Sequence, residues 1–531
     1  MNGALFLKIA LVGGILYSVF VLSIFPHWIV DDAFITLRYA ENLSQSGELT
    51  WNVNTDPVEG YTGVALPVIL AALQILGAPL VSATHWIGIL SFFVSMLFLL
   101  LILRNLTIDP IVCAVVFILY STCAPLFTHA TSGHDTMLFL CAMFISFYTL
   151  TVNMSGKGVP FSQWKNIAFF ASLLFTSLVR PEGVAFSIIL FVAAAYWVRR
   201  YHMEQWRSLL TNGAIGYVLP GSVYFIWRMN YYGLLLPNTF YVKGAQGFSL
   251  ANLQDLTLFL CQFFLVPILI TVFFLSREAG SVRTALKRYV FPIRKETTIV
   301  LLSFVGIILV LLFEVGTSTL VMNYSGRFYI PFLPMLFIGF AYVLHNGISS
   351  FSGTENKKAS SLVILFVILL FGVVFQVGVN MVVLRREYTF VKEYRSILEQ
   401  EHIPIGKWLR EYIPKEEWLV TYVDAGAIPY LSKLQTIDFG ALSDEFLTQK
   451  DLSPQEIADY AFARNPGVMV FTSTVADKLV YDDIYKERMQ FIIEDLRFKN
   501  YTLVRKYLSD SSLPSGYHQF VYFRNDLPSN K

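Results

Sequence analysis

The feature that most constrains this chain is a series of apolar runs, each long enough to cross a lipid bilayer. A hydrocarbon core of roughly 30 Å requires about 20 apolar residues in a helix. Of the 531 residues, 55% are hydrophobic and 14% are charged, which is unlike a soluble domain. We therefore predict a polytopic α-helical membrane protein with about 11 transmembrane helices, at Ala4–Phe25, Trp86–Leu103, Pro110–Phe127, Thr136–Val152, Trp164–Val179, Val184–Val198, Leu209–Trp227, Leu256–Leu275, Thr298–Phe313, Phe328–Leu344 and Ser361–Leu384.

The segment Thr62–Leu76 is also apolar, but Pro67 interrupts it and a Gly-Ala-Pro turn follows it. Cytoplasmic loops are enriched in Lys and Arg, and counting this segment as a span would invert that bias in every later loop. We therefore predict an interfacial helix inside a first outward loop, residues 26–80, and a cytoplasmic amino terminus. The outward loops then carry these basic residues: Arg38, Arg180, Arg228, Lys243 and Arg327.

The first outward loop begins with two adjacent carboxylates, Asp31 and Asp32, a few residues beyond the first span. Charged groups at the hydrocarbon boundary are costly, so they are candidates for function. A simpler reading is that one of them is the N-cap of a helix over Ala33–Ser44, since Asp is a favoured capping residue. One cap requires only one Asp, and the two readings are compatible.

Later outward loops carry further polar residues. His129 and His134 are five residues apart, with Asp135 next, which is a weak metal-ligand spacing. That turn either faces a substrate or simply connects two helices. Arg180 and Glu182 either form a local ion pair or bind a donor.

The loop after residue 227 is rich in aromatic residues, which commonly anchor a chain at the membrane interface. Lys243 lies among them, and a lysine is a compact charge suited to a phosphate. Arg327 lies at the start of a span, where its guanidinium either holds a phosphate through two hydrogen bonds or snorkels to the interface.

Residues 385–531 have an ordinary mixed composition and predict a soluble α/β domain beyond the membrane domain, residues 1–384. Its expected strands are Trp418–Val423, Val468–Thr472, Thr502–Tyr507 and Gln519–Phe523, and its expected helices are Tyr388–Tyr412, Pro454–Arg464 and Asp482–Leu496. The segment Asp424–Tyr430 follows a strand end and forms either a tight turn or a cradle for an acceptor.

Several function classes lose support. The net charge of +2 gives no basis for nucleic-acid binding, and the four cysteines lie within or beside apolar runs without metal-ligand spacing. The chain contains no P-loop, dinucleotide fingerprint, nucleophile elbow or zinc motif.

Seven motifs together resemble the GT-C superfamily of membrane glycosyltransferases, and most of all the branch containing the mycobacterial terminal arabinofuranosyltransferase. They are IVDDAFITLRYAENL, VEGYTG, TSGHDT, LVRPEG, YYGLLLPNTFYVK, SGRFYIPFLP and DAGAIPYLS. The resemblance implies a polyprenyl-phosphate-linked sugar donor and transfer on the outer face of the cell membrane to a glycan, lipid or protein acceptor. It also implies a catalytic carboxylate in the first outward loop, here Asp31 or Asp32.

A lipid-linked sugar phosphate already has a good leaving group, so the reaction requires a base for the acceptor hydroxyl and positive charge for the phosphate. We expect Asp31 or Asp32 to be the base and Arg38, Lys243 and Arg327 to bind the phosphate. Successive helical residues point about 100° apart, so the two acids are not expected to act on one atom. The second acid then orients the acceptor, binds a divalent cation or caps the helix. Polar residues of the same motifs are predicted to bind substrate: Glu59, Tyr61, His134, Asp135, Arg180, Glu182, Asn238 and Tyr241.

Two other classes remain open. A transporter or flippase of a lipid-linked saccharide is typically built from paired inverted halves with broken helices, and no such symmetry is evident in the sequence. A receptor-like protein that displays the tail has no need of acids beside the first span.

Overall fold

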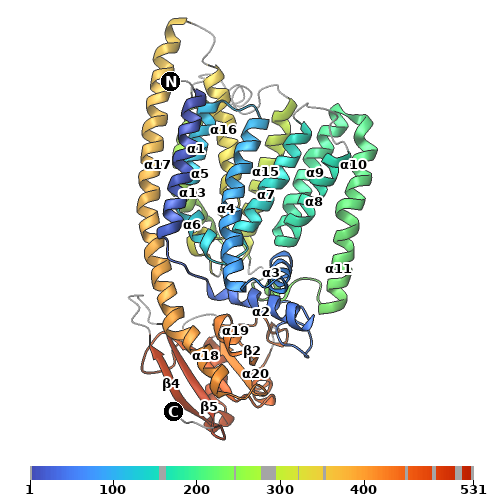
Figure 1. Cartoon of the computed structure of the whole chain (residues 1–531), viewed down its shortest axis with the longest axis vertical. Helices are drawn as coiled ribbons and strands as arrows, with labels where there is room; N and C mark the ends of the chain where they lie inside the picture. Colours follow the sequence, from blue (N-terminus) through green and yellow to red (C-terminus); the bar gives the residue numbers. More distant parts are fainter. Residues whose placement is uncertain are drawn as a thin grey trace.

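The structure is a computed structural model that describes residues 3–154, 163–243, 247–276, 295–320, 322–350, 355–448, 452–480, 486–508 and 517–527. Figure 1 shows a bundle of long helices with a smaller domain of helices and strands at one end. We call this end of the bundle the domain end. The amino terminus lies at the opposite end.

Each expected span coincides largely with a helix. The bundle consists of α1 (Gly3–Ile24), α4 (Leu80–Asn105), α5 (Pro110–Ser121), α6 (Ala124–Thr131), α7 (Thr136–Met154), α8 (Gln163–Val179), α9 (Glu182–Tyr201), α10 (Trp206–Gly213), α11 (Leu219–Tyr232), α13 (Leu250–Ser276), α15 (Lys295–Thr317), α16 (Leu333–Ser350) and α17 (Glu355–Ile397). Within the described ranges, seven helices are long and apolar enough to cross a membrane, or eight if the α5–α6 pair, bent by 54°, is one span. A 3-10 turn, η1 (Met203–Gln205), and a π-helical turn, η2 (Ala214–Val218), flank α10. The chain is a multi-pass membrane protein.

The first loop carries α2 (Asp31–Ser46) and α3 (Ala65–Ile75) between the bundle and the C-terminal domain (Figure 1). At 11 residues, α3 is roughly 16 Å long, too short to span the hydrocarbon core. The N-cap of α2 is Val30, and no side chain caps the helix. The capping prediction for Asp31 or Asp32 is therefore wrong, because both lie in the first turn.

Two short elements shape the domain end of the bundle. Helix α12 (Asn238–Lys243) follows α11, and a 3-10 turn, η4 (Tyr324–Gly326), precedes α16. Ser325 and Gly326 in this turn both have positive φ, 50° and 66°. A Cβ at position 326 would meet the ring of Phe259, so only glycine fits there.

The C-terminal domain continues directly from α17 (Figure 1). A π-helical turn, η5 (Leu398–His402), leads into α18 (Ile403–Tyr412). The remaining elements are β1 (Trp418–Tyr422), α19 (Ala427–Ser432), β2 (Gln435–Asp438), η6 (Phe446–Thr448), α20 (Pro454–Ala463), β3 (Val468–Ser473), α21 (Lys486–Glu494), η7 (Leu496–Asn500), β4 (Tyr501–Leu508) and β5 (His518–Arg524). The strand order is β2-β1-β3-β5-β4; β1 pairs in parallel with β2 and β3, and β5 pairs antiparallel with β3 and β4.

The sheet is covered on both faces, as its alternating apolar residues require. Leu419 of β1 belongs to a core with residues of α18 and α19, whereas its neighbour Val420 belongs to a core with residues of α20 and α21. The domain is therefore α/β, as predicted. Strand β2 was not predicted, because four residues with three polar side chains show no clear strand pattern.

Candidate active site

Asp32 and Arg327 face each other at the domain end of the bundle. Asp32 lies in the first turn of α2, and Arg327 directly follows Gly326. Arg327 Nη1 lies 3.8 Å from Asp32 Oδ2, and the two side chains are 4% and 20% exposed. Asp32 is thus the more accessible partner of a mostly buried ion pair.

The guanidinium of Arg327 is only partly satisfied. Its Nη2 donates to His134 Nδ1 over 3.2 Å, while its Nε and Nη1 have no hydrogen-bond partner among the described residues. Buried polar groups are normally hydrogen-bonded, so these two N–H donors are candidates to bind a ligand. His134 must accept at Nδ1, and burial together with the Arg327 charge lowers the pKa of His134. A neutral His134 therefore adds no second positive charge beside Arg327, and the Asp32 carboxylate lies 3.8 Å from that guanidinium.

Behind His134 lies a buried ion-pair network. Arg180 Nη1 lies 3.4 Å from Asp135 Oδ1, and Arg180 Nη2 lies 2.8 Å from Glu182 Oε1. Burial raises the pKa of Asp135, but Arg180 outweighs it and the pKa is below its ordinary value. Arg180 is committed to two carboxylates, so it supports the His134 turn and is not free to bind a phosphate.

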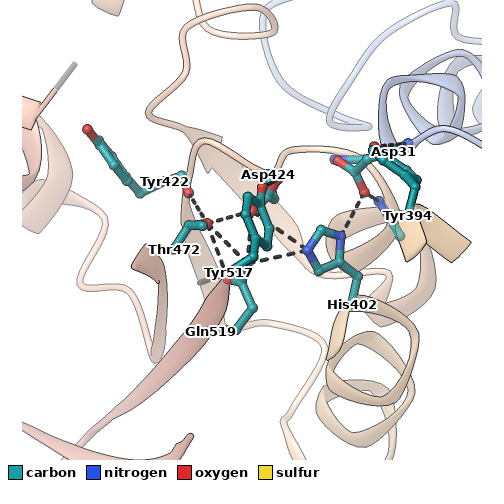
Figure 2. A network of polar contacts seen from close by, with 10 residues as sticks. Asp31, Tyr394, His402, Tyr422, Asp424, Thr472, Tyr517 and Gln519 are labelled. Atoms are coloured by element: carbon teal, nitrogen blue, oxygen red, sulfur yellow. Dashed lines mark hydrogen bonds and ion pairs between the residues drawn. The ribbon is translucent and has the colours of Figure 1, made fainter. Parts of the chain in front are cut away.

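The carboxylate of Asp31 is directed toward His402 and the C-terminal domain (Figure 2). Its Oδ2 accepts from the N–H of Gly426 at 2.9 Å, and its Oδ1 accepts from the N–H of Ala427 at 2.8 Å and from His402 Nδ1 at 3.2 Å. Burial raises the pKa of Asp31, but these hydrogen bonds and the charge of His402 outweigh it and hold the pKa below its ordinary value. Asp31 is 5% exposed, and both of its carboxylate oxygens accept hydrogen bonds.

His402 connects Asp31 to a second acid, Asp424, whose Oδ2 lies 3.7 Å from His402 Nε2 (Figure 2). Asp424 also accepts from Thr472, from Gln519 and from Tyr517. Burial raises the pKa of Asp424, and the nearby Asp31 adds to this effect against the opposing charge of His402.

These three groups are also the candidate for the divalent cation considered above. One ligand atom from each of Asp31, His402 and Asp424 lies within 4.8 Å of the others. However, each of the four carboxylate oxygens already accepts a protein hydrogen bond, and each nitrogen of His402 faces a carboxylate. The imidazole would have to give up its contact with one acid to bind a cation, so the contacts present favour a hydrogen-bonded network over a metal site.

The structure places Arg38 elsewhere than expected. Its Nε donates to Trp51 O, its Nη1 to Pro429 O, and its Nη2 to Asn52 Oδ1 and Leu434 O. The guanidinium is buried and stacks on Trp51, 4.4 Å from the ring centre. The prediction that Arg38 binds phosphate does not fit this geometry, because Arg38 joins α2 to the C-terminal domain.

Three other predicted substrate residues also have structural partners. Glu59 forms a buried ion pair with Arg228, and Tyr61 shares a hydrogen bond with Tyr232 at 3.1 Å. Asn238 Nδ2 donates to backbone carbonyl groups of the C-terminal domain, the nearest at 2.8 Å.

The last two predicted residues lie on α12. Tyr241 is 38% exposed, and its ring packs edge-on against Phe240. Lys243 ends α12, and its side chain lies outside the described part of the structure.

Two clefts that share Asp255 and Asn323 open beside η4. The larger, of about 780 Å³, is lined by amide, hydroxyl and carboxylate side chains with Phe248 at one side. The smaller, of about 280 Å³, lies between α13 and α17. It is lined by residues of both helices, among them Phe259, and by Gly326 of η4. Gly326 directly precedes Arg327, so the smaller cleft reaches the turn that carries this arginine.

Sequence reasoning did not single out His402, or Tyr394, whose hydroxyl accepts from the N–H of Asp31. It left Asp424–Tyr430 as either a tight turn or a cradle for an acceptor. His402 is 371 residues from Asp31, and no spacing pattern connects them. The only signal was the glycine-containing turn after a strand, at Gly426, where a Cβ would meet the backbone of Asp31.

The membrane bundle, the long first loop and the C-terminal mixed domain are together similar in fold to solved membrane proteins of the GT-C fold. ArnT from Cupriavidus metallidurans in the apo state matches with a TM-score of 0.59 and 13% identity, covering 96% of this chain and 97% of that one. The same protein bound to undecaprenyl phosphate gives a TM-score of 0.55 at 13% identity, covering 97% of both chains. An oligosaccharyltransferase from Archaeoglobus fulgidus, tethered to an acceptor peptide, gives 0.51 at 12% identity, covering 99% of this chain and 75% of that one.

Sequence comparison adds little. Residues 391–522 match a family described as a domain of unknown function, DUF8728. No curated protein matches the chain. The arabinofuranosyltransferase branch therefore stays a prediction.

Proposed function

We propose that this protein is a membrane glycosyltransferase that transfers a sugar from a polyprenyl-phosphate-linked donor to a glycan, lipid or protein acceptor of the cell envelope. The observation that carries the proposal is the grouping of Asp32 with Arg327, whose Nε and Nη1 lack hydrogen-bond partners among the described residues. The GT-C fold supports it, since ArnT with that fold was solved with undecaprenyl phosphate.

Arg327 supplies the charge that the leaving group needs. A guanidinium presents paired donors that match phosphate oxygens, and such charge-assisted hydrogen bonds are about twice as strong as neutral ones. Nε and Nη1 point in different directions, so a phosphate oxygen can accept from either of these open donors. Developing negative charge on the departing polyprenyl phosphate is stabilised there.

Asp32 supplies the base. Its carboxylate removes the proton from the acceptor hydroxyl while the hydroxyl oxygen bonds to the anomeric carbon of the sugar. The bond between that carbon and the phosphate oxygen breaks, and its electron pair leaves with the polyprenyl phosphate. Asp31 is not suited to this step, because both of its oxygens are occupied by donors from the C-terminal domain.

The distribution of basic residues supports an outward-facing site. Most Lys and Arg between the spans fall in loops on the side of the amino terminus, and cytoplasmic loops carry this excess. The domain end, with Asp32 and the C-terminal domain, then lies outside the cell, where transfer to envelope acceptors takes place.

The proposal is tested with the full-length protein in proteoliposomes, supplied with undecaprenyl-phosphate monosaccharides carrying a radioactive sugar and with extracted envelope lipids and glycans. We expect release of free undecaprenyl phosphate together with radioactivity in the acceptor fraction. Movement of the intact lipid-linked sugar between leaflets, without release of undecaprenyl phosphate, would instead identify a flippase.

A further inference from the structure

The end of α17 and the C-terminal domain together hold Asp31, the residue next to Asp32, at three points. The N–H of Asp31 donates to the hydroxyl of Tyr394 at 3.0 Å, and its carboxylate accepts from His402 and from two backbone N–H groups. The third point is Gly426, which packs so closely on the Asp31 carbonyl that no side chain fits there. The backbone and the side chain of Asp31 are both fixed.

Fixing Asp31 also fixes Asp32. Consecutive Cα atoms are about 3.8 Å apart, and both residues lie in the first turn of α2, where the helix dictates the direction of each side chain. A small rotation of this turn would move the Asp32 carboxylate relative to Arg327. The attachment of Asp31 therefore sets the geometry of the proposed base.

His402 bridges the two parts of the chain. It lies in η5, where α17 passes into the C-terminal domain, and its ring is 3.2 Å from Asp31 and 3.7 Å from Asp424 (Figure 2). Asp424 is in turn anchored on β3 and β5 through Thr472 and Gln519. A chain of polar contacts thus runs from the central strands of the sheet to the first turn of α2.

We propose that Asp31, His402 and Asp424 form a clasp through which the C-terminal domain positions Asp32 for catalysis. The inference rests on the proposed glycosyl transfer. Asp31 and His402 are then positioning residues, and the second acid of the pair has neither a catalytic nor a metal-binding role.

The test compares Asp31→Asn, His402→Phe and His402→Gln in the full-length protein. Asn at position 31 turns an N–H₂ group toward donors, and Phe at 402 removes both bridging nitrogens. A misplacement near 1 Å lowers a rate about 100-fold, so both variants should lose about that factor in kcat while the donor KM stays within about threefold. His402→Gln can still donate to Asp31 and should recover part of the loss.

A matched control is Glu41→Gln. Glu41 also joins α2 to the C-terminal domain, through Lys433, but it lies near the other end of the helix. This variant should retain the kcat of the unchanged protein. Combining Asp31→Asn with His402→Phe should cost no more than either change alone, because both break one clasp.

A second readout does not depend on activity. Hydrogen exchange at the amides of Gly426 and Ala427, which donate to Asp31, should accelerate at least tenfold in Asp31→Asn and remain unchanged in Glu41→Gln. If Asp31→Asn leaves both kcat and hydrogen exchange unchanged while Asp32→Asn is inactive, the clasp proposal is wrong. The glycosyltransferase proposal would still hold in that case. Stoichiometric zinc in the purified protein that is lost in His402→Phe would also overturn it, in favour of a metal site.

Discussion

Asp31 and Asp32 are neighbours in the first turn of α2, but their carboxylates contact different parts of the molecule. The Asp31 carboxylate accepts three hydrogen bonds from the C-terminal domain, whereas Asp32 lies 3.8 Å from Arg327 across the candidate active site. The helical twist of about 100° per residue accounts for this separation. Asp31 binds the C-terminal domain, and Asp32 is the acid that can take part in the reaction.

Replacing Arg327 by Gln should weaken binding of undecaprenyl phosphate to the full-length protein. Losing one hydrogen bond to a charged group costs about 1.5–3 kcal/mol, so the dissociation constant should rise about 10- to 100-fold. The control is Arg395→Gln, which removes an arginine from an exposed helical pair and should leave the affinity unchanged. Equal affinity for both variants would remove Arg327 from the donor site.

Arg38→Lys should destabilise the protein without changing the donor KM. A lysine ammonium has three N–H donors on one nitrogen, so it cannot serve all four acceptors that the guanidinium bridges, and at least one of them loses this hydrogen bond. We expect a loss of about 2–3 kcal/mol in the free energy of unfolding, measured by denaturant titration in detergent. A raised donor KM with unchanged stability would instead restore the phosphate role that the sequence suggested.

Gly426→Ala should disturb the contact between the C-terminal domain and α2. The added Cβ meets the backbone of Asp31, which cannot rotate away, and such overpacking costs about 1–3 kcal/mol. Sugar transfer should fall together with the thermal stability. Gly378→Ala is the control, because a Cβ there meets nothing within 4 Å, and this variant should be at least as stable as the unchanged protein.

Asp438 predicts a pH dependence of the C-terminal domain. Burial raises its pKa to about 7, against hydrogen bonds from the N–H groups of Ser443 and Gly440. The folded state therefore binds the proton more tightly than the unfolded state, whose pKa is near 3.8. This group's contribution to stability is complete below about pH 4 and is lost as the pH rises through about 7.

The measurement is the difference in melting temperature between the full-length protein and Asp438→Asn, which does not titrate. Between pH 5 and pH 8, we expect the melting temperature of the unchanged protein to fall relative to that of Asp438→Asn. A difference that is the same at both pH values would contradict the assignment.

The helices of the bundle were predictable because apolar length is a property of single segments. Thr62–Leu76 illustrates this, since Pro67 and the charge bias were enough to distinguish it from a span. The candidate site was predictable only in part. Arg327 and His134 were both predicted as site residues, and they lie together. Two partners of Arg38, however, are the carbonyl groups of Pro429 and Leu434, and no local pattern reports such contacts.

The interdomain contacts were not predictable for the same reason. His402 lies in a helical region and resembles an ordinary surface histidine until the fold brings Asp31 to it. Asp424 was noticed as a residue after a strand, but its role depends on Thr472 and Gln519 of neighbouring strands. Long-range pairing created these clusters, and one sequence does not contain that information.

The central claim is that Asp32 is the base for transfer from a polyprenyl-phosphate donor, and single-turnover release of undecaprenyl phosphate by Asp32→Asn tests it most directly. Asparagine keeps the shape of the side chain and removes the base, so release should slow about 100-fold or more. Binding of undecaprenyl phosphate should persist, because Arg327 is unchanged. Release within about threefold of the unchanged protein would contradict the account.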